Sequence, residues 1–196
     1  MMYYKYFKRI IDISLAFIGL PLLGLVFIFI APIIYLEDKG PIFYNANRLG
    51  INGKIFKMYK FRTMKKNTID IRNNDGSTYN CKDDNRMTKI GRVLRNSSLD
   101  EAPQIINVIK NEMSIIGPRP DLPDQFILYN DYEKRKLDIK PGITGYNQAY
   151  YRNNTNWKKR IINDIKYIDN ISIIIDIKIF YKTILTVFKR ENIYNV

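Results

Sequence analysis

The chain has 196 residues, with 32 Lys and Arg against 19 Asp and Glu, which gives a formal net charge of +13. This length suits one domain of ordinary size, and the single cysteine, Cys81, excludes an internal disulfide framework. Because histidine is absent, His-based metal sites and a Ser-His-Asp triad are also excluded. The positive charge implies an anionic partner: nucleic acid, anionic lipid or a phosphorylated substrate.

The N-terminal region contains a long apolar segment, in which no charged residue occurs between Asp12 and Glu37. A bilayer crossing needs about 20 apolar residues, so the segment is long enough to cross a membrane and too long for a signal-peptide core. Pro21 predicts a bend. Basic residues flank both ends, so the positive-inside rule assigns no orientation. A helix that enters and leaves through one leaflet and a straight span with a modest kink both fit.

The next part of the chain predicts a hairpin followed by a loop. Residues 41–43 and 54–61 combine aromatic and β-branched side chains, and the turn dipeptide Asn52-Gly53 lies just before the second segment. Residues 65–86 contain almost nothing to bury, which predicts an exposed, mobile loop.

Helical patterns dominate the remainder. A short helix is predicted over 88–95 and a second from Ser98 to about Glu112, with apolar side chains at helical spacing. The residues that this second helix is expected to bury are Ile105, Ile106, Ile109 and Met113. An amphipathic helix with a basic face is predicted over 171–190, where it fits either a membrane surface or the protein core. Asp176 within it is expected to pair with a basic residue.

Asp100 and Glu101 are adjacent carboxylates with two possible roles. With Ser98 they fit a capping box, in which Ser98 is the N-cap and Glu101 the third helical residue. Alternatively they are catalytic, because side chains of neighbouring helical residues diverge by about 100° and converge on one site only at a helix end. A carboxylate kept ionised near a helix N-terminus and arginines can act as a nucleophile or hold Mg²⁺.

Several basic residues are candidates for binding phosphate. Arg92 and Arg95 precede the carboxylates, and Arg119 stands between two prolines that limit its backbone freedom and place a bidentate phosphate ligand. Other basic residues alternate with aromatic ones, which fits phosphate binding, nucleic-acid binding or a solvated strand face. These are Arg48, Lys57, Lys60 and Arg62.

The order of short motifs along nearly the whole chain resembles that of the monotopic phosphoglycosyl transferases, the bacterial sugar transferase family that begins lipid-linked glycan assembly. The matching motifs are Lys8-Arg9-Ile10-Ile11-Asp12, Arg48-Leu49-Gly50, Lys57-Met58-Tyr59-Lys60-Phe61-Arg62-Thr63-Met64, Thr88-Lys89-Ile90-Gly91, Leu94-Arg95, Ser98-Leu99-Asp100-Glu101-Ala102-Pro103-Gln104, Asn107-Val108, Met113-Ser114-Ile115-Ile116-Gly117-Pro118-Arg119-Pro120 and Lys140-Pro141-Gly142-Ile143-Thr144-Gly145.

The resemblance implies a mostly helical α/β fold at the bacterial inner membrane. Residues 1–38 would form a re-entrant membrane helix, and residues 39–196 a catalytic domain on the cytoplasmic face, with a short β-hairpin and amphipathic interfacial helices. The family breaks the membrane helix at a Ser-Pro pair. The nearest candidate here is Leu20-Pro21, which lacks the serine.

The resemblance also implies a reaction. Asp100 would attack the β-phosphate of a UDP-sugar, release UMP, and pass the sugar phosphate to undecaprenyl phosphate. Glu101 would assist, and both carboxylates would hold Mg²⁺. Arg95 and Arg119 match positions near the phosphates, and the further candidates for substrate contacts are Lys60, Arg62 and Arg152. The expected partners are the UDP-sugar, undecaprenyl phosphate and inner-membrane lipid, without nucleic acid; the resemblance leaves the sugar and the oligomeric state open.

Two other functions remain open from the sequence. One is a membrane-anchored protein without enzymatic activity that binds nucleic acid or anionic lipid through its basic face. The other is a glycosyltransferase that moves only the sugar, whose nucleotide product would be UDP rather than UMP.

Overall fold

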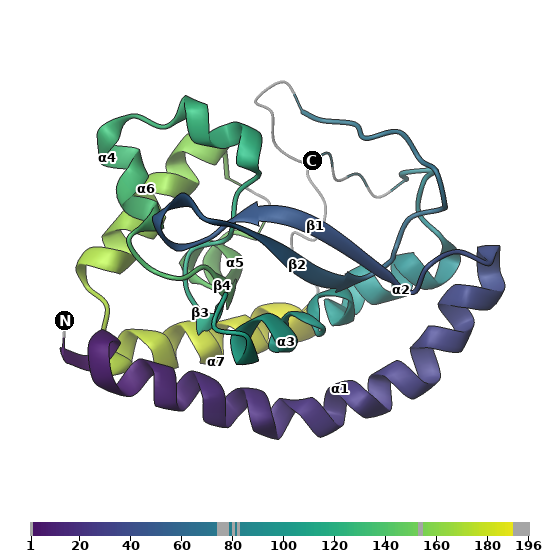
Figure 1. The fold of residues 1–196 in the computed structure, drawn as a ribbon, viewed down its shortest axis with the longest axis horizontal. Helices are drawn as coiled ribbons and strands as arrows, with labels where there is room; N and C mark the ends of the chain where they lie inside the picture. Colours follow the sequence, from purple (N-terminus) through teal and green to yellow (C-terminus); the bar gives the residue numbers. More distant parts are fainter. Residues whose placement is uncertain (1, 74–78, 80, 82, 153–154, 190–196) are drawn as a thin grey trace.

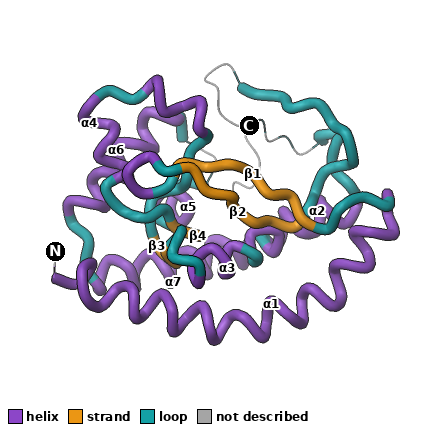
Figure 2. The backbone as a smooth tube through the Cα atoms, in the orientation of Figure 1, coloured by secondary structure: helices purple, strands orange, loops and turns teal. Residues whose placement is uncertain are grey.

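The computed structural model describes residues 2–73, 79, 81, 83–152 and 155–189. The elements in chain order are η1 (Tyr3–Phe7), α1 (Lys8–Asp38), β1 (Phe43–Leu49), η2 (Ile51–Gly53), β2 (Ile55–Phe61), α2 (Lys89–Ser97), η3 (Leu99–Glu101), α3 (Gln104–Ile109), β3 (Ser114–Ile116), η4 (Pro123–Leu128), α4 (Asp131–Lys134), η5 (Arg135–Leu137), β4 (Gly142–Thr144), α5 (Tyr146–Tyr150), α6 (Trp157–Asp169) and α7 (Ile173–Lys189). Figure 2 shows two small sheets among helices, so the prediction of a mostly helical fold with a short hairpin is confirmed.

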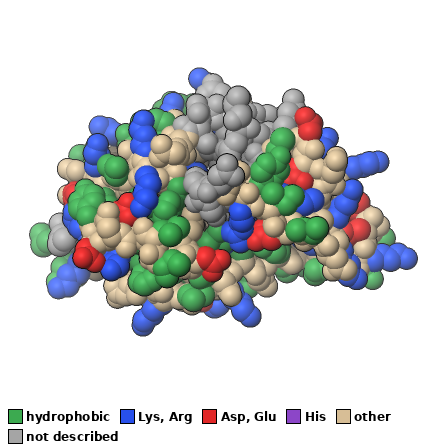
Figure 3. Space-filling view, turned by 90° about the horizontal axis from the view of Figure 1, so that it is seen from above, with side chains coloured by type: hydrophobic (Ala, Val, Ile, Leu, Met, Phe, Trp, Pro, Cys, Tyr) green, Lys and Arg blue, Asp and Glu red, His purple; other side chains and the backbone are tan. Residues whose placement is uncertain are grey.

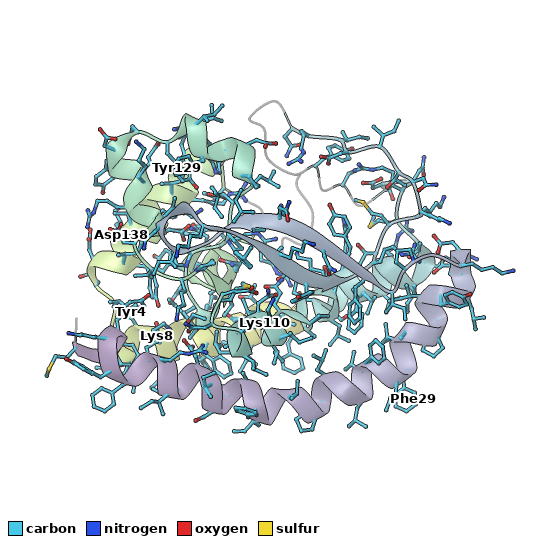
Figure 4. The ribbon with its side chains drawn as sticks, viewed as in Figure 1. Tyr4, Lys8, Phe29, Lys110, Tyr129 and Asp138 are labelled. Carbon is cyan, nitrogen blue, oxygen red and sulfur yellow. The ribbon has the colours of Figure 1, made fainter. Side chains whose placement is uncertain are left out.

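Helix α1 forms a long arc beneath the rest of the molecule (Figure 1). It runs unbroken over 31 residues and contains both Pro21 and Pro32. The expected break at Leu20-Pro21 is therefore wrong: the helix curves but continues, because the loss of one backbone donor at each proline removes a single helical hydrogen bond. Most of its apolar side chains face outward, as Phe29 does in Figure 4, with 69% of its surface exposed.

The N-terminal end of α1 is held by buried polar contacts. Lys8 Nζ lies 2.6 Å from a carboxylate oxygen of Asp176 on α7, which confirms that Asp176 pairs with a basic residue. One turn further, Asp12 accepts hydrogen bonds from the Ser114 hydroxyl at 2.7 Å and the Ile115 amide at 3.0 Å. These contacts attach the start of the helix to both α7 and β3.

The C-terminal end of α1 is attached to the same body. Arg62 donates to both carboxylate oxygens of Asp38, each at 2.6 Å, and also to the Ile34 carbonyl at 3.2 Å. Glu37 accepts the backbone amide of Lys89 at 2.6 Å, at the start of α2. A carboxylate there satisfies a free amide of the first helical turn.

Strands β1 and β2 form the antiparallel hairpin that the sequence predicts, with Phe43 opposite Phe61. The first strand starts at Phe43 and runs to Leu49, later than the predicted 41–43. At the turn, Asn52 and Gly53 have φ values of 54° and 73°, a left-handed conformation that Asn and Gly adopt most readily.

A second sheet joins β3 to β4 in parallel, with Ser114 opposite Gly142 and Ile116 opposite Thr144. The strands approach so closely that a Cβ on Gly142 would lie 2.1 Å from the Gly117 nitrogen. Only glycine fits there.

The helix predicted from Ser98 to about Glu112 is also different in the structure. The chain forms the 3₁₀ turn η3, and α3 covers only Gln104–Ile109 before the chain reverses at Asn111, where φ is 67°. Met113 is buried, as predicted, and the three isoleucines are partly buried against it or against neighbouring clusters. Helices α2 and α7 agree with prediction over the described residues, and residue 190 lies outside them.

Residues 65–86 form no helix and no strand where the structure describes them. Residues 74–78, 80 and 82 of this predicted loop lie outside the described part.

Candidate active site

The two carboxylates lie on the short turn η3, between α2 and α3. Ser98 adopts a left-handed conformation, with φ of 58°, and its amide closes the C-terminal end of α2. The predicted capping box is therefore wrong, because Ser98 ends α2 and its side chain caps no amide of the following turn η3. Its hydroxyl instead accepts a hydrogen bond from Arg152 at 3.0 Å.

Glu101 is fixed by two cations. Lys60 Nζ from β2 lies 2.5 Å from Glu101 Oε1, and Arg119 lies 3.3 Å from the same oxygen. Burial alone would raise the pKa of Glu101, but Lys60 and then Arg119 outweigh burial and lower the pKa to about 2. Glu101 is therefore ionised and held in one orientation.

Asp100 has a different environment. Burial, opposed by the charge of Lys60 and reinforced by the neighbouring Glu101, raises the pKa of its carboxyl to about 6. Within the described ranges, no donor forms a hydrogen bond with the Asp100 carboxylate. At neutral pH Asp100 is ionised, partly desolvated and unengaged, which are the properties of a nucleophile.

Arg95 reaches this site from α2 because that helix packs very closely on the segment after β2. A Cβ on Gly91 would lie 2.0 Å from the Thr63 carbonyl oxygen, so glycine permits the approach. The Arg95 Nε then donates to the Thr63 hydroxyl at 3.0 Å. The positive charge of Arg95 opposes the rise in the pKa of Asp100 that burial causes.

Arg119 is placed by the segment that leaves β3. Next to it, the Asp121 carbonyl accepts the amide of Leu49 at 2.9 Å, which ties the segment to the end of β1. The Asp121 carboxylate pairs with buried Lys136 at 2.5 Å. These two anchors hold Arg119 beside Glu101 while 40% of its side chain stays exposed.

Arg48 joins the cluster, and the sequence did not single it out from other basic residues. Burial and then the positive charge of Arg119 lower the pKa of Arg48 to about 10. Asp121 is near, but its carboxylate is engaged by Lys136 and Tyr129. In the sequence, the only indication of a role for Arg48 was its position near the end of a predicted hairpin segment, just before Leu49-Gly50.

The two remaining candidates have different positions. Arg152 lies at the site, since it donates to the hydroxyl of Ser98, two residues before Asp100. Arg62 does not join the carboxylates: its donors are occupied by Asp38, the Pro41 carbonyl and the end of α1. It holds the membrane-type helix to the body, a role that its place in the motif did not reveal.

The site combines two adjacent carboxylates with a surrounding set of cations, which suits phosphoryl chemistry. Those cations are Lys60, Arg95, Arg119, Arg152 and Arg48. Figure 3 shows Lys and Arg side chains spread widely over the upper face, with fewer carboxylates between them. Among the described residues no group of three or more His, Cys, Asp or Glu forms a metal site. The pair nevertheless suits Mg²⁺, which proteins often bind through one or two carboxylates plus substrate phosphates.

Comparison with known proteins agrees with this chemistry. The family model for the bacterial sugar transferases matches residues 3–190, so the chain belongs to that family. It is 42% identical to a galactosyl transferase, CpsE, of Streptococcus agalactiae over 95% of this chain and 44% of that protein. It is 38% identical to the uncharacterized sugar transferase EpsL of Bacillus subtilis, over 95% of this chain and 89% of EpsL.

A third relative has a more specific name. The undecaprenyl-phosphate galactose phosphotransferase of Salmonella typhimurium is 37% identical over 81% of this chain and 36% of its own length. The chain thus spans less than half of the streptococcal and Salmonella proteins but most of EpsL.

Proposed function

We propose that this protein is a phosphoglycosyl transferase, which moves a sugar phosphate from a UDP-sugar to undecaprenyl phosphate. The observation that carries the proposal is the unengaged carboxylate of Asp100, beside a Glu101 that Lys60 and Arg119 hold in place. The name of the Salmonella relative supports the same acceptor and the transfer of a phosphosugar. The product would begin the lipid-linked assembly of a glycan.

The chemistry has two steps. In the first, an oxygen of Asp100 attacks the β-phosphorus of the UDP-sugar, the bond from that phosphorus to the bridging oxygen breaks, and UMP leaves with the electron pair. In the second, a phosphate oxygen of undecaprenyl phosphate attacks the phosphorus of the aspartyl sugar phosphate. The bond to Asp100 then breaks, which regenerates the carboxylate and yields the lipid diphosphate sugar.

The cations act in both steps. Phosphoryl transfer depends on in-line positioning and on stabilisation of charge on the phosphoryl oxygens. Arg95 precedes the acidic pair in the sequence and Arg119 follows it. Arg119 and Lys60 both contact Glu101. Mg²⁺ held by Asp100 and Glu101 would supply further neutralisation of the phosphate charge.

The location proposed is the cytoplasmic face of the bacterial inner membrane. The segment Tyr3–Asp38 is long and apolar enough to cross a membrane, and only 11% of its most apolar window is buried. A nucleotide sugar is soluble and a polyprenyl phosphate is held at the headgroup layer. A site at that interface meets both substrates.

The test is nucleotide release. Purified protein with Mg²⁺, undecaprenyl phosphate and a panel of UDP-sugars is expected to release UMP, measured by chromatography. Asp100→Asn should lower the rate by about 10³-fold or more, because the amide is no nucleophile. Asp138→Asn, at an exposed carboxylate on another part of the body, is the matched control.

Three outcomes contradict the proposal. UMP release that survives Asp100→Asn would show that another group carries the reaction. Release of UDP would indicate a glycosyltransferase that moves only the sugar. Failure to release any nucleotide, together with tight binding of nucleic acid or anionic vesicles, would indicate a membrane-anchored binding protein.

A further inference from the structure

A buried polar network connects the two segments that carry Arg119 and Arg152. Its centre is Lys136 of η5, of which only 3% is exposed. Lys136 Nζ lies 2.5 Å from a carboxylate oxygen of Asp121 and 3.3 Å from a carboxylate oxygen of Asp164 on α6. One lysine therefore joins a carboxylate next to the cationic site to a carboxylate inside the body.

On one side the network reaches Arg119. Asp121 lies two residues after Arg119 with a single proline between them, so little backbone freedom separates the anchored carboxylate from the arginine. The hydroxyl of Tyr129, which Figure 4 labels, donates to the same carboxylate. Lys136 and residues 118–121 also line one small cavity of about 10 Å³, so the lysine packs directly against this segment.

On the other side the network reaches Arg152. Asp164 accepts a hydrogen bond from the side-chain amide of Asn147 at 2.7 Å, and Asn163 donates to the side-chain oxygen of Asn147 at 2.9 Å. The backbone carbonyl of Asn147 accepts the amide of Arg152 at 2.8 Å. The Arg152 guanidinium then donates to the Ser98 hydroxyl at 3.0 Å. The turn that carries Arg152 is therefore attached to the same lysine.

The two arginines contact the acidic turn η3 at its two ends. Arg119 lies 3.3 Å from Glu101, the last residue of η3, and Arg152 contacts Ser98, which precedes the first. Asp100 lies between these two contacts. The separation of the two guanidinium groups decides which phosphate oxygens they reach together, and phosphoryl transfer depends on such positioning.

The composition of the network suits placement better than it suits stability. One buried lysine faces two carboxylates, and transfer of such charges from water to the interior costs free energy that apolar side chains of similar volume avoid. Ion pairs and hydrogen bonds fix direction as well as distance, which apolar contacts do not. The network therefore defines how the segments that it joins are oriented.

We propose that Lys136 is a positioning residue, which sets the separation of Arg119 and Arg152 across the acidic turn through its two carboxylate partners. The inference rests on the proposed function, because it gives the two arginines a shared ligand, the diphosphate of the UDP-sugar. Lys136 is buried and acts through the arginines, without touching the substrate.

Lys136→Met tests the proposal because it keeps the length of the side chain and removes the charge that joins the two carboxylates. In the UMP-release assay, the KM for the UDP-sugar should rise about five-fold and kcat should fall about ten-fold, since neither arginine is held at its phosphate. Loss of folded protein lowers the maximal rate but leaves KM unchanged. The rise in KM therefore separates positioning from stability. A wild-type KM in Lys136→Met would overturn the proposal.

Lys8→Met is the matched control. Lys8 is also 3% exposed and lies 2.6 Å from Asp176, but this pair attaches α1 to the body and holds neither arginine. Lys8→Met should also lower the melting temperature, yet keep the wild-type KM at a temperature where both variants are folded. An equal rise in KM in the two variants would overturn the proposal.

A double-mutant cycle shows whether the effect passes through Arg119. Once Arg119→Ala has removed one of the two arginines, adding Lys136→Met should raise the KM by clearly less than it does in the wild type. Independent effects, which multiply, would overturn the proposal.

Asp121→Asn provides a second variant in case Lys136→Met does not fold. It leaves Lys136 paired with Asp164 and releases only the segment of Arg119, so it should give part of the rise in KM. A wild-type KM in Asp121→Asn would overturn the proposal.

Binding of inorganic pyrophosphate separates this proposal from the proposed function. Its dissociation constant, measured by calorimetry, should rise about five-fold in Lys136→Met and stay unchanged in Lys8→Met. If no UDP-sugar yields UMP, the proposed function fails, yet the dissociation constants still decide the role of Lys136. Equal binding by wild type and Lys136→Met would overturn the proposal, as would absence of pyrophosphate binding to the wild type.

Discussion

At the scale of single residues, this protein packs two carboxylates around one lysine in two places, and in each place one carboxyl pKa is lowered and the other is raised. Lys60 contacts Glu101 and lowers its pKa, whereas burial raises the pKa of Asp100 to about 6. In the second case Lys136 lowers the pKa of Asp121 despite burial. Asp164 lies 3.3 Å from the same lysine, and burial raises its pKa to about 6.

The pKa of Asp164 gives a prediction about pH. Because the folded-state pKa of about 6 exceeds the ordinary value of 3.8, the folded state binds the proton more strongly. The ionised carboxylate of Asp164 therefore destabilises the folded state above pH 6, and this destabilisation disappears as the pH falls toward 4. Asp164→Asn should gain stability relative to wild type between pH 5 and pH 7.5, by at most about 1.5 kcal/mol, which is roughly half of the full cost of such a pKa shift.

The measurement is thermal unfolding in detergent at both pH values, with Asp138→Asn as an exposed control. A difference in stability between the Asp164→Asn variant and wild type that does not change with pH would contradict the assigned pKa shift.

At the scale of elements, the parallel pair β3–β4 positions the segment that carries Arg119. Its geometry depends on two glycines that face each other: Gly117 donates its amide to the Thr144 carbonyl at 2.9 Å, and Gly142 donates to the Pro118 carbonyl at 2.9 Å. A Cβ on Gly142 would lie 2.1 Å from Gly117 N and 2.3 Å from the Thr144 oxygen. Both contacts are with backbone atoms, which cannot move without displacing a strand.

Gly142→Ala should therefore separate the two strands and displace Arg119. We expect a loss of about 1–3 kcal/mol in stability and a fall in UMP release larger than the fall in folded protein explains. Circular dichroism melting and the release assay give the two quantities. Gly24→Ala, where the added Cβ meets no atom within 4 Å, is the control and should be at least as stable as wild type. An unchanged melting temperature in Gly142→Ala would mean that the strands tolerate the Cβ.

At the scale of the whole molecule, α1 has both ends attached to one body. Its 31 residues would span about 46 Å as a straight helix, which exceeds the roughly 30 Å hydrocarbon core of a bilayer. Length therefore permits a crossing, but the attachments oppose it. A straight span would separate either Lys8 from Asp176 or Asp38 from Arg62. Lys8–Asp176 is a buried pair, and breaking such a pair costs about 3–5 kcal/mol.

We therefore predict that residue 2 and the body lie on the same side of the membrane. In a Cys81→Ser background, Met2→Cys and Asp138→Cys should both resist a membrane-impermeant maleimide in intact spheroplasts and react after permeabilisation. Both native side chains are exposed in the structure. Labelling of Met2→Cys from the outside would establish a straight span instead.

The sequence by itself determined the features that depend on local patterns. The apolar segment, the turn at Asn52-Gly53, helix α2 and the amphipathic α7 follow from hydrophobic period and turn chemistry, which act over a few residues. The acidic pair could be found in the same way, since its neighbours in sequence already included Arg95.

Only the tertiary structure decided how these parts meet. Ser98 ends α2 in a left-handed conformation, and its side chain caps no amide of η3. The roles of Arg62, Arg119 and Arg48 diverge because each depends on a partner far away in sequence. The pairing of β3 with β4, and the attachment of both ends of α1, join segments more than 20 residues apart, and such contacts leave no local pattern.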